Sequence, residues 1–275
     1  MTTSQFVNIQ WGDKNARIEY QWVGSADASR PLVIFLHEGL GSVAMWKGFP
    51  QQLVEAANCR GLVYSRPGYG KSTPREKEET WQADFMHRQA FEVLPALFVA
   101  LGIDTAANPP LLYGHSDGGS IALLFAARYP MNASGIIVVA PHIFVEDVSI
   151  SSIEEAKIAY LTTTPQTNHL RGKLSRYHDD VDSAFWGWND VWLNPAFRRW
   201  NLTQAIKTIA CPLLAIQGLD DEYGTLEQIR SIKRLLPQTQ LLEIPNCGHS
   251  PHRDQPEALI KACVAFVISV VGPHP

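Results

Sequence analysis

The sequence has no block of clustered lysine and arginine. Its 275 residues carry 23 basic and 27 acidic side chains, which gives a formal net charge of −4. Nucleic-acid binding relies on grouped cations that neutralise phosphates, so this distribution argues against a nucleic-acid partner. It is typical of a mildly acidic surface, and the length suffices for one large core or for a core that carries an insertion.

A long uninterrupted apolar run is also missing. The most apolar stretch, ALIKACVAFVISVVG, contains Lys261 and is shorter than the roughly 18 apolar residues that a membrane-spanning helix requires. The first twenty residues lack the basic, apolar and small-residue order of a secretion signal. We therefore expect a cytoplasmic enzyme without a membrane partner.

Cysteine is scarce. The four cysteines, Cys59, Cys211, Cys247 and Cys263, are far apart in the sequence and form no CxxC pair. Each lies in or beside an apolar run, which is typical of small buried thiols. Disulfide bonds and a zinc site are therefore disfavoured, and we expect neither a metal nor a cofactor.

The sequence does contain a regular alternation of short apolar runs with helical patterns. Near the N-terminus, 7–11 and 16–24 alternate apolar and polar residues as half-exposed strands do. Six later runs are continuously apolar, which suits strands that are buried on both faces of a parallel sheet. These runs lie at 31–38, 61–68, 109–116, 135–141, 212–218 and 239–245.

Helical periodicity separates the later runs, at 80–101, 117–129, 225–236 and 255–271. This order predicts an α/β fold with a mostly parallel, doubly wound sheet of eight strands. One interval, 144–210, has no apolar strand run and is dense in aromatic residues. We interpret it as a helical insertion after the sixth strand, with 1–143 and 211–275 forming the core.

The segment Gly114-His115-Ser116-Asp117-Gly118 gives the strongest functional signal. It matches G-x-S-x-G and stands between a buried strand and a helix. The sharp turn strains the backbone at Ser116, and the two glycines leave room for it. The turn exposes the hydroxyl at the carboxyl ends of the strands, where open α/β sheets bind ligands. Ser116 is therefore the predicted nucleophile.

A serine needs a positioned base, and the base needs an acid to orient it. His249 follows the last strand, so its loop opens at the same edge of the sheet as Ser116, and we predict that it is the base. Asp220 and Asp221 both follow the strand at 212–218. We favour Asp221 as the acid, and Asp220 stays open because a pattern does not resolve one residue in a turn.

Other histidines have weaker claims to the role of base. His252 is the less favoured alternative. His37 is expected to shape the loop after its strand, and His115 to pack beside the nucleophile. His169 and His178 belong to the insertion, where we expect them on the surface.

Backbone N–H groups must stabilise the anion that forms when serine attacks a carbonyl. One donor should be Asp117, the residue after the nucleophile. The second should come from the loop His37-Glu38-Gly39-Leu40-Gly41, with Gly39 favoured and the choice open by one residue. Glu38 is unusual beside such a loop, and we expect it to hold the loop by hydrogen bonds.

Together these motifs resemble the α/β-hydrolase superfamily over essentially the whole chain. The matching segments are LHEGLGS, RPGYGKS, GHSDGG, GLDDEYGT and NCGHSPH, and the order serine, aspartate, histidine is that of the superfamily. The resemblance implies a carboxylesterase-like serine hydrolase in which 144–210 is a lid. Two positions depart from the family pattern: Glu38 follows His37 where glycine is usual, and Tyr64-Ser65 replaces an aspartate before RPGYGKS.

The inner face of this lid is implied to form the substrate pocket. Phe185, Trp188 and Trp192 have helical spacing, so we predict that they share the inward face and that at least one lines the pocket. Trp186 should point elsewhere. Aromatic residues that only pack the lid on the core are a nearly equal alternative.

The favoured activity is hydrolysis of a small-molecule carboxylic ester, of small to medium size, through an acyl-enzyme. Hydrolysis of a C–C bond in ring-cleavage products, of a lactone or of an amino-acid ester remains open, as does a non-catalytic ligand receptor on the same fold. Dehalogenases and epoxide hydrolases of this fold resemble the chain less, because their nucleophile is an aspartate and here it is Ser116.

Overall fold

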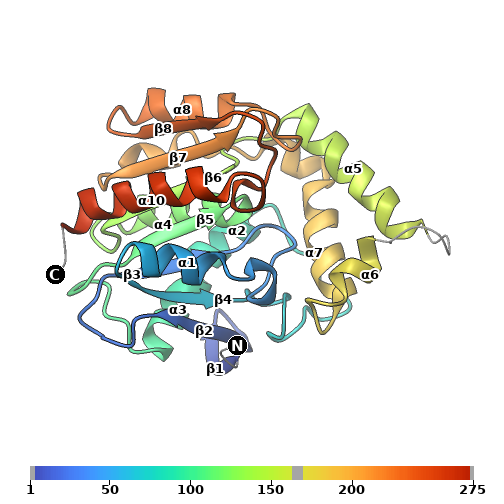
Figure 1. The fold of residues 1–275 in the computed structure, drawn as a ribbon. Helices are drawn as coiled ribbons and strands as arrows, with labels where there is room; N and C mark the ends of the chain where they lie inside the picture. The colour runs from blue at the N-terminus through green and yellow to red at the C-terminus, as the bar shows by residue number, and fades with distance from the viewer. Residues whose placement is uncertain (1–3, 163–169, 273–275) are drawn as a thin grey trace.

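The computed structural model describes residues 4–162 and 170–272, and one eight-stranded sheet runs through its centre (Figure 1). The spatial order of the strands is β1-β2-β4-β3-β5-β6-β7-β8. Their bounds are β1 Gln5–Trp11, β2 Lys14–Gly24, β3 Leu32–Leu36, β4 Arg60–Tyr64, β5 Leu111–His115, β6 Gly135–Val139, β7 Leu213–Gly218 and β8 Gln240–Ile244. All eight predicted strands are confirmed.

The sheet is antiparallel at one end and parallel elsewhere. β1 and β2 form a hairpin that turns at Gly12, whose φ of 56° lies in the left-handed region open to glycine. β2 pairs with β4 in antiparallel orientation, and every later neighbour pair is parallel. The carboxyl ends of β3, β5, β7 and β8 therefore open at one edge of the sheet, which is where the predicted site residues follow the strands.

Helices cover both faces of the sheet and, in the insertion, lie at one end of it (Figure 1). They are α1 Phe49–Ala56, α2 Phe85–Arg88, α3 Leu94–Ala100, α4 Asp117–Arg128, α5 Asp147–Leu161, α6 Leu170–Leu174, α7 Val181–Trp192, α8 Glu227–Leu235, α9 Pro251–Asp254 and α10 Pro256–Val271. A π-helical turn, Gln89–Val93, joins α2 to α3, so the helix predicted at 80–101 is a composite that starts later. α1 was not predicted, because eight residues are too few to show a clear helical period.

Alternate strand residues point to two separate cores. Ile34, Leu112 and Val138 pack with α2, α3 and α4 on one face. Val33 and Tyr113 pack with α1 and α10 on the other. Because these strands are buried on both faces, their sequences are continuously apolar rather than alternating between apolar and polar residues.

The apolar C-terminal helix belongs to the second of these cores. α10 buries Leu259, Cys263, Phe266 and Val267 against the sheet. In the described part of the chain, no helix is long and apolar enough to cross a membrane. All four cysteines are buried thiols, as their apolar surroundings predict.

The regular elements described in the insertion between β6 and β7 are helices, apart from an isolated bridge between Phe144 and Asn201. α5, α6 and α7 lie together at one end of the molecule, beside the sheet rather than over either face (Figure 1). Two short 3-10 turns, Pro195–Arg199 and Ala205–Thr208, lead back to the core. This placement brings the insertion to the edge at which the strands open.

Candidate active site

Ser116 occupies a strained turn between β5 and α4. Its φ of 53° and ψ of −120° are rare for a residue with a side chain. A Cβ atom at Gly114 would lie 2.2 Å from the Gly118 carbonyl oxygen, and one at Gly118 would lie 2.1 Å from the Leu36 carbonyl oxygen. Only glycine fits at either position, so the two glycines of the motif are what allow this turn to form.

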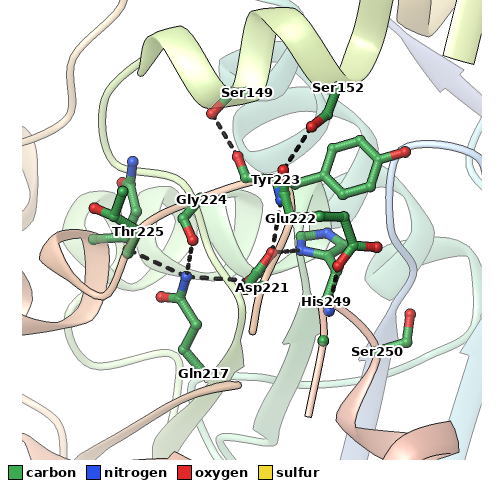
Figure 2. Close-up of polar contacts among 12 residues, drawn as sticks. Ser149, Ser152, Gln217, Asp221, Glu222, Tyr223, Gly224, Thr225, His249 and Ser250 are labelled. Carbon is green, nitrogen blue, oxygen red and sulfur yellow. Dashed lines mark hydrogen bonds and ion pairs between the residues drawn. The ribbon is translucent and has the colours of Figure 1, made fainter. Parts of the chain in front are cut away.

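His249 is paired with Asp221. Nδ1 of His249 lies 2.8 Å from Oδ1 of Asp221, and both side chains are largely buried (Figure 2). The same carboxylate accepts hydrogen bonds from the Tyr223 backbone N–H at 2.9 Å and from Gln217 Nε2 at 3.1 Å. Asp220 is exposed, and the contact of His249 is with Asp221. Of the two candidate acids, the structure therefore brings only Asp221 to the histidine.

The two partners stabilise each other in their charged forms. Burial lowers the pKa of His249, but the Asp221 carboxylate outweighs burial and raises this pKa above the ordinary imidazole value. Burial raises the pKa of Asp221, and the charge and hydrogen bond of His249 outweigh it, so the net shift is downward. The protonated form of His249 is thus stabilised at this position.

Two further histidines approach His249 but have a different electrostatic character. His142 and His252 both line the cavity that contains Ser116. Burial lowers the pKa of each to about 3, so both rings stay neutral near pH 7. His252 packs against Trp46 rather than beside a carboxylate of the acid turn. These surroundings favour His249 over His252 as the base, and sequence reasoning did not single out His142.

The acid turn is held by the first helix of the insertion. Ser149 Oγ donates to the Tyr223 carbonyl at 2.6 Å, and Ser152 Oγ donates to the Glu222 carbonyl at 2.6 Å (Figure 2). The Glu222 carboxylate in turn accepts the backbone N–H of His249 at 3.1 Å. α5 therefore positions the turn that carries Asp221, and no sequence motif indicated these two serines.

His37 and Arg66 hold the β3–α1 loop, residues 37–43, in place through hydrogen bonds. Arg66 donates through its side chain to the carbonyls of His37 and Glu38, and its backbone N–H donates to His37 Nε2 at 3.0 Å. His37 therefore shapes the loop, as its position after a strand predicts. Gly39 of this loop lines the same cavity as Ser116 and Asp117. A Cβ atom at Gly39 would lie 2.2 Å from the indole nitrogen of Trp188, so only glycine fits there.

His178 corrects one expectation about the insertion. It is buried rather than on the surface, and it accepts the Gly70 N–H at 2.9 Å through Nδ1. Its Nε2 lies 2.9 Å from the Leu40 carbonyl oxygen. His178 thus ties the insertion to the loop that carries Gly39. His169 lies outside the described residues.

Glu38 contacts a histidine instead of holding the loop with its side chain. Its Oε2 lies 3.6 Å from Nδ1 of His115, and only its backbone carbonyl accepts hydrogen bonds from the loop. Burial raises the pKa of Glu38, but the neighbouring His115 outweighs it and leaves this pKa below its ordinary value. His115 also places Nε2 2.7 Å from the His249 carbonyl oxygen, so it connects Glu38 to the histidine loop.

The three predicted pocket aromatics divide into two groups. Trp188 and Trp192 lie in the cavity wall. Phe185 does not line the cavity: it is fully buried and stacks on Tyr160 with ring centroids 3.6 Å apart. The structure thus places two of the three in the cavity wall and Phe185 outside it, because helical spacing fixes a face but not which part of that face meets the cavity. Trp186 points elsewhere, and Lys157 lies 5.8 Å from its ring centre.

Asp117 combines a cavity position with a buried carboxylate. Trp192 Nε1 donates to Oδ1 of Asp117 at 3.2 Å, and Arg66 lies 4.0 Å from Oδ2. Burial raises the pKa of Asp117 to about 6, with Arg66 opposing the shift. The cavity onto which Ser116, His249, Gly39 and Asp117 all open has a volume of about 500 Å³.

Comparisons with known proteins identify the family and the fold of the chain. A family model described as "Alpha/beta hydrolase family" matches residues 33–262. A 2-hydroxy-6-oxo-6-phenylhexa-2,4-dienoate hydrolase of Burkholderia cepacia is 26% identical over 97% of this chain and 96% of its own length. A bifunctional esterase/perhydrolase of Acinetobacter calcoaceticus is 24% identical over 98% of this chain and 99% of its own length. The solved structure of an esterase from Thermogutta terrifontis, at 19% identity, has a TM-score of 0.71 over 98% of this chain and 99% of that one, and it shows the same fold.

The Asp221–His249 contact predicts how His249 titrates. In Asp221→Asn the pKa of His249 should fall, because burial still disfavours the imidazolium and the carboxylate that opposed burial is gone. Histidine ring NMR across a pH series measures this pKa directly. Asp220→Asn is the matched control and should leave the titration unchanged. A fall in the control variant instead would assign the acid to Asp220.

Proposed function

The chain belongs to the alpha/beta hydrolase family, and from that premise we propose that it is a serine hydrolase that cleaves carboxylic esters of small to medium size. The observation that carries the proposal is the shared cavity of Ser116, in its strained turn, and His249, which Asp221 orients at 2.8 Å. A nucleophile, a base and an acid in this relation are what acyl transfer requires.

The reaction would proceed through an acyl-enzyme. His249 takes the proton of the Ser116 hydroxyl as its oxygen attacks the ester carbonyl, and Asp221 stabilises the imidazolium. His249 then protonates the departing alcohol. Water repeats the sequence on the acyl group and releases the carboxylic acid, with Ser116 restored.

The backbone N–H groups of Asp117 and Gly39 would stabilise the oxyanion. Both residues line the cavity beside Ser116, and Gly39 belongs to a loop held by Arg66, His37 and His178. Loss of one such donor costs about 3 kcal/mol in the activation barrier of a comparable enzyme. This cost explains why the loop is fixed by so many contacts.

The insertion, 144–210, would serve as the lid. Trp188, Trp192 and Ile153 of its helices line the cavity together with Ser116. Their apolar surfaces suit a hydrocarbon or aromatic acyl group. The name of the Acinetobacter relative includes esterase, which supports an ester as the substrate.

A C–C bond hydrolase is the second candidate. The Burkholderia relative is named for the hydrolysis of a phenylhexadienoate, and its similarity extends over nearly the whole chain. The same serine, histidine and acid would operate on a ketone carbonyl. A parallel assay of p-nitrophenyl esters and of vinylogous diketones separates the two activities.

The cytoplasm is the proposed location of the protein. Cys59, Cys211, Cys247 and Cys263 are all buried free thiols. Reduced cysteines are typical of proteins in a reducing compartment.

Replacement of the nucleophile tests the proposal. Ser116→Ala should lower the turnover of p-nitrophenyl butyrate by roughly 10⁴-fold or more, because no other group can form the acyl-enzyme. The melting temperature should be unchanged, since the hydroxyl fills no core volume. Ser151→Ala, an exposed serine on α5, is the control and should retain full activity. Substantial turnover by folded Ser116→Ala would refute the assignment.

The pH dependence gives a second test. kcat/KM should rise with pH and reach its midpoint above the ordinary histidine value of about 6.5, because only neutral imidazole acts as base and Asp221 raises the pKa of His249. Burial raises the pKa of Asp117 to about 6, so this carboxyl group is the competing explanation. Asp117→Asn should therefore keep the midpoint. A profile that is flat between about pH 5 and 8, or that loses its midpoint in Asp117→Asn, would contradict a histidine base.

A further inference from the structure

Four basic side chains converge on the cavity from three directions. Lys47 lies shortly before α1, Lys173 and Arg176 lie in α6 and the turn after it, and Arg253 lies in α9 on the histidine loop. All four residues are exposed whereas Ser116 is buried, so the basic residues belong to the solvent-facing part of the cavity wall, which we call its mouth. Within the described ranges, none of the four has a carboxylate within 4 Å.

The acids that share the cavity wall already have partners. Glu38 faces His115, Asp117 is buried against Trp192 and Arg66, and Glu222 accepts the backbone N–H of His249. The cavity wall thus carries four basic side chains and three carboxyl groups, and none of these carboxyl groups lies within 4 Å of the four cations. This local excess of positive charge contrasts with the net charge of −4 of the whole chain.

Lys47 carries a second, independent indication of function. Its backbone has φ 53° and ψ −130°, close to the φ 53° and ψ −120° of Ser116. A residue with a side chain is strained in this region, and such strain concentrates at functional sites. The next residue, Gly48, could adopt such a backbone conformation without strain. The strained residue is nevertheless Lys47, which lines the cavity.

The interior of the cavity has the opposite character. Ile153, Leu174, Trp188 and Trp192 line it as well, and all four are buried, as Ser116 is. A complementary ligand has a reactive carbonyl at one end, an apolar segment in the middle and an anion at the other end. Arginine pairs with planar carboxylates through two parallel hydrogen bonds, and lysine adds a point charge.

We propose that the substrate is an ester whose acyl chain ends in a carboxylate, which Lys47, Lys173, Arg176 and Arg253 bind at the cavity mouth. The inference deepens the proposed function and rests on it for the position of the reacting carbonyl. The carboxylate is bound equally in the ground state and in the transition state, because it is remote from the bond that breaks. Its recognition should therefore lower KM and leave kcat unchanged.

A pair of matched esters tests this specificity. The mono-p-nitrophenyl ester of glutaric acid carries the free carboxylate, and its methyl-capped counterpart is neutral and has the same chain. The wild-type protein should favour the acid by about tenfold or more in kcat/KM at low salt, and added salt should shrink the preference. Lys173→Gln/Arg176→Gln should reduce the preference by about fivefold through KM. Lys261→Gln, an exposed lysine on α10 remote from the cavity, should not change it.

A binding measurement separates this inference from the proposed function. Monomethyl glutarate should bind Ser116→Ala more tightly than neutral dimethyl glutarate does in calorimetry, and Lys173→Gln/Arg176→Gln should remove the difference. Failure to hydrolyse either p-nitrophenyl ester, with this binding preference retained, would contradict the esterase activity alone. Equal binding of the two glutarates, or equal hydrolysis of the two p-nitrophenyl esters, would overturn the anion site.

Discussion

The close approach of α4 to β3 and β5 is the constraint on which the site depends. The backbones at Gly114, Gly118 and Leu36 are so near one another that a single Cβ atom would collide with a carbonyl group. This contact forces the chain to turn sharply at Ser116 and holds the residue in a conformation that costs about 1–3 kcal/mol. The surrounding strands and helices bury enough apolar surface to maintain that strain, and the hydroxyl is presented at the strand ends as a result.

The insertion positions other parts of the candidate site as well as lining its cavity. Ser149 and Ser152 hold the turn of Asp221, and His178 holds the loop of Gly39. The acid and the proposed oxyanion donor are thus both positioned through contacts with residues of the insertion.

Local signals explain which features could be predicted from the sequence. The eight strands appear as short apolar runs, and Ser116 and His249 each follow a strand within a distinctive motif. The features that escaped prediction depend on tertiary contacts. His178 is buried because it contacts Gly70 and Leu40 of two different loops. Phe185 lies outside the cavity wall, where its ring stacks on Tyr160. The choice of Asp221 over Asp220 likewise needed the geometry of the turn.

The central claim is that the strained Ser116 becomes covalently acylated with the help of His249. The most direct measurement is intact-protein mass spectrometry after reaction with p-nitrophenyl acetate and rapid acid quenching, followed by peptide mapping. The account predicts one added acetyl group per chain, located on Ser116, whose accumulation keeps pace with a burst of p-nitrophenol. Turnover without any covalent adduct, or an adduct located on another residue, would contradict it.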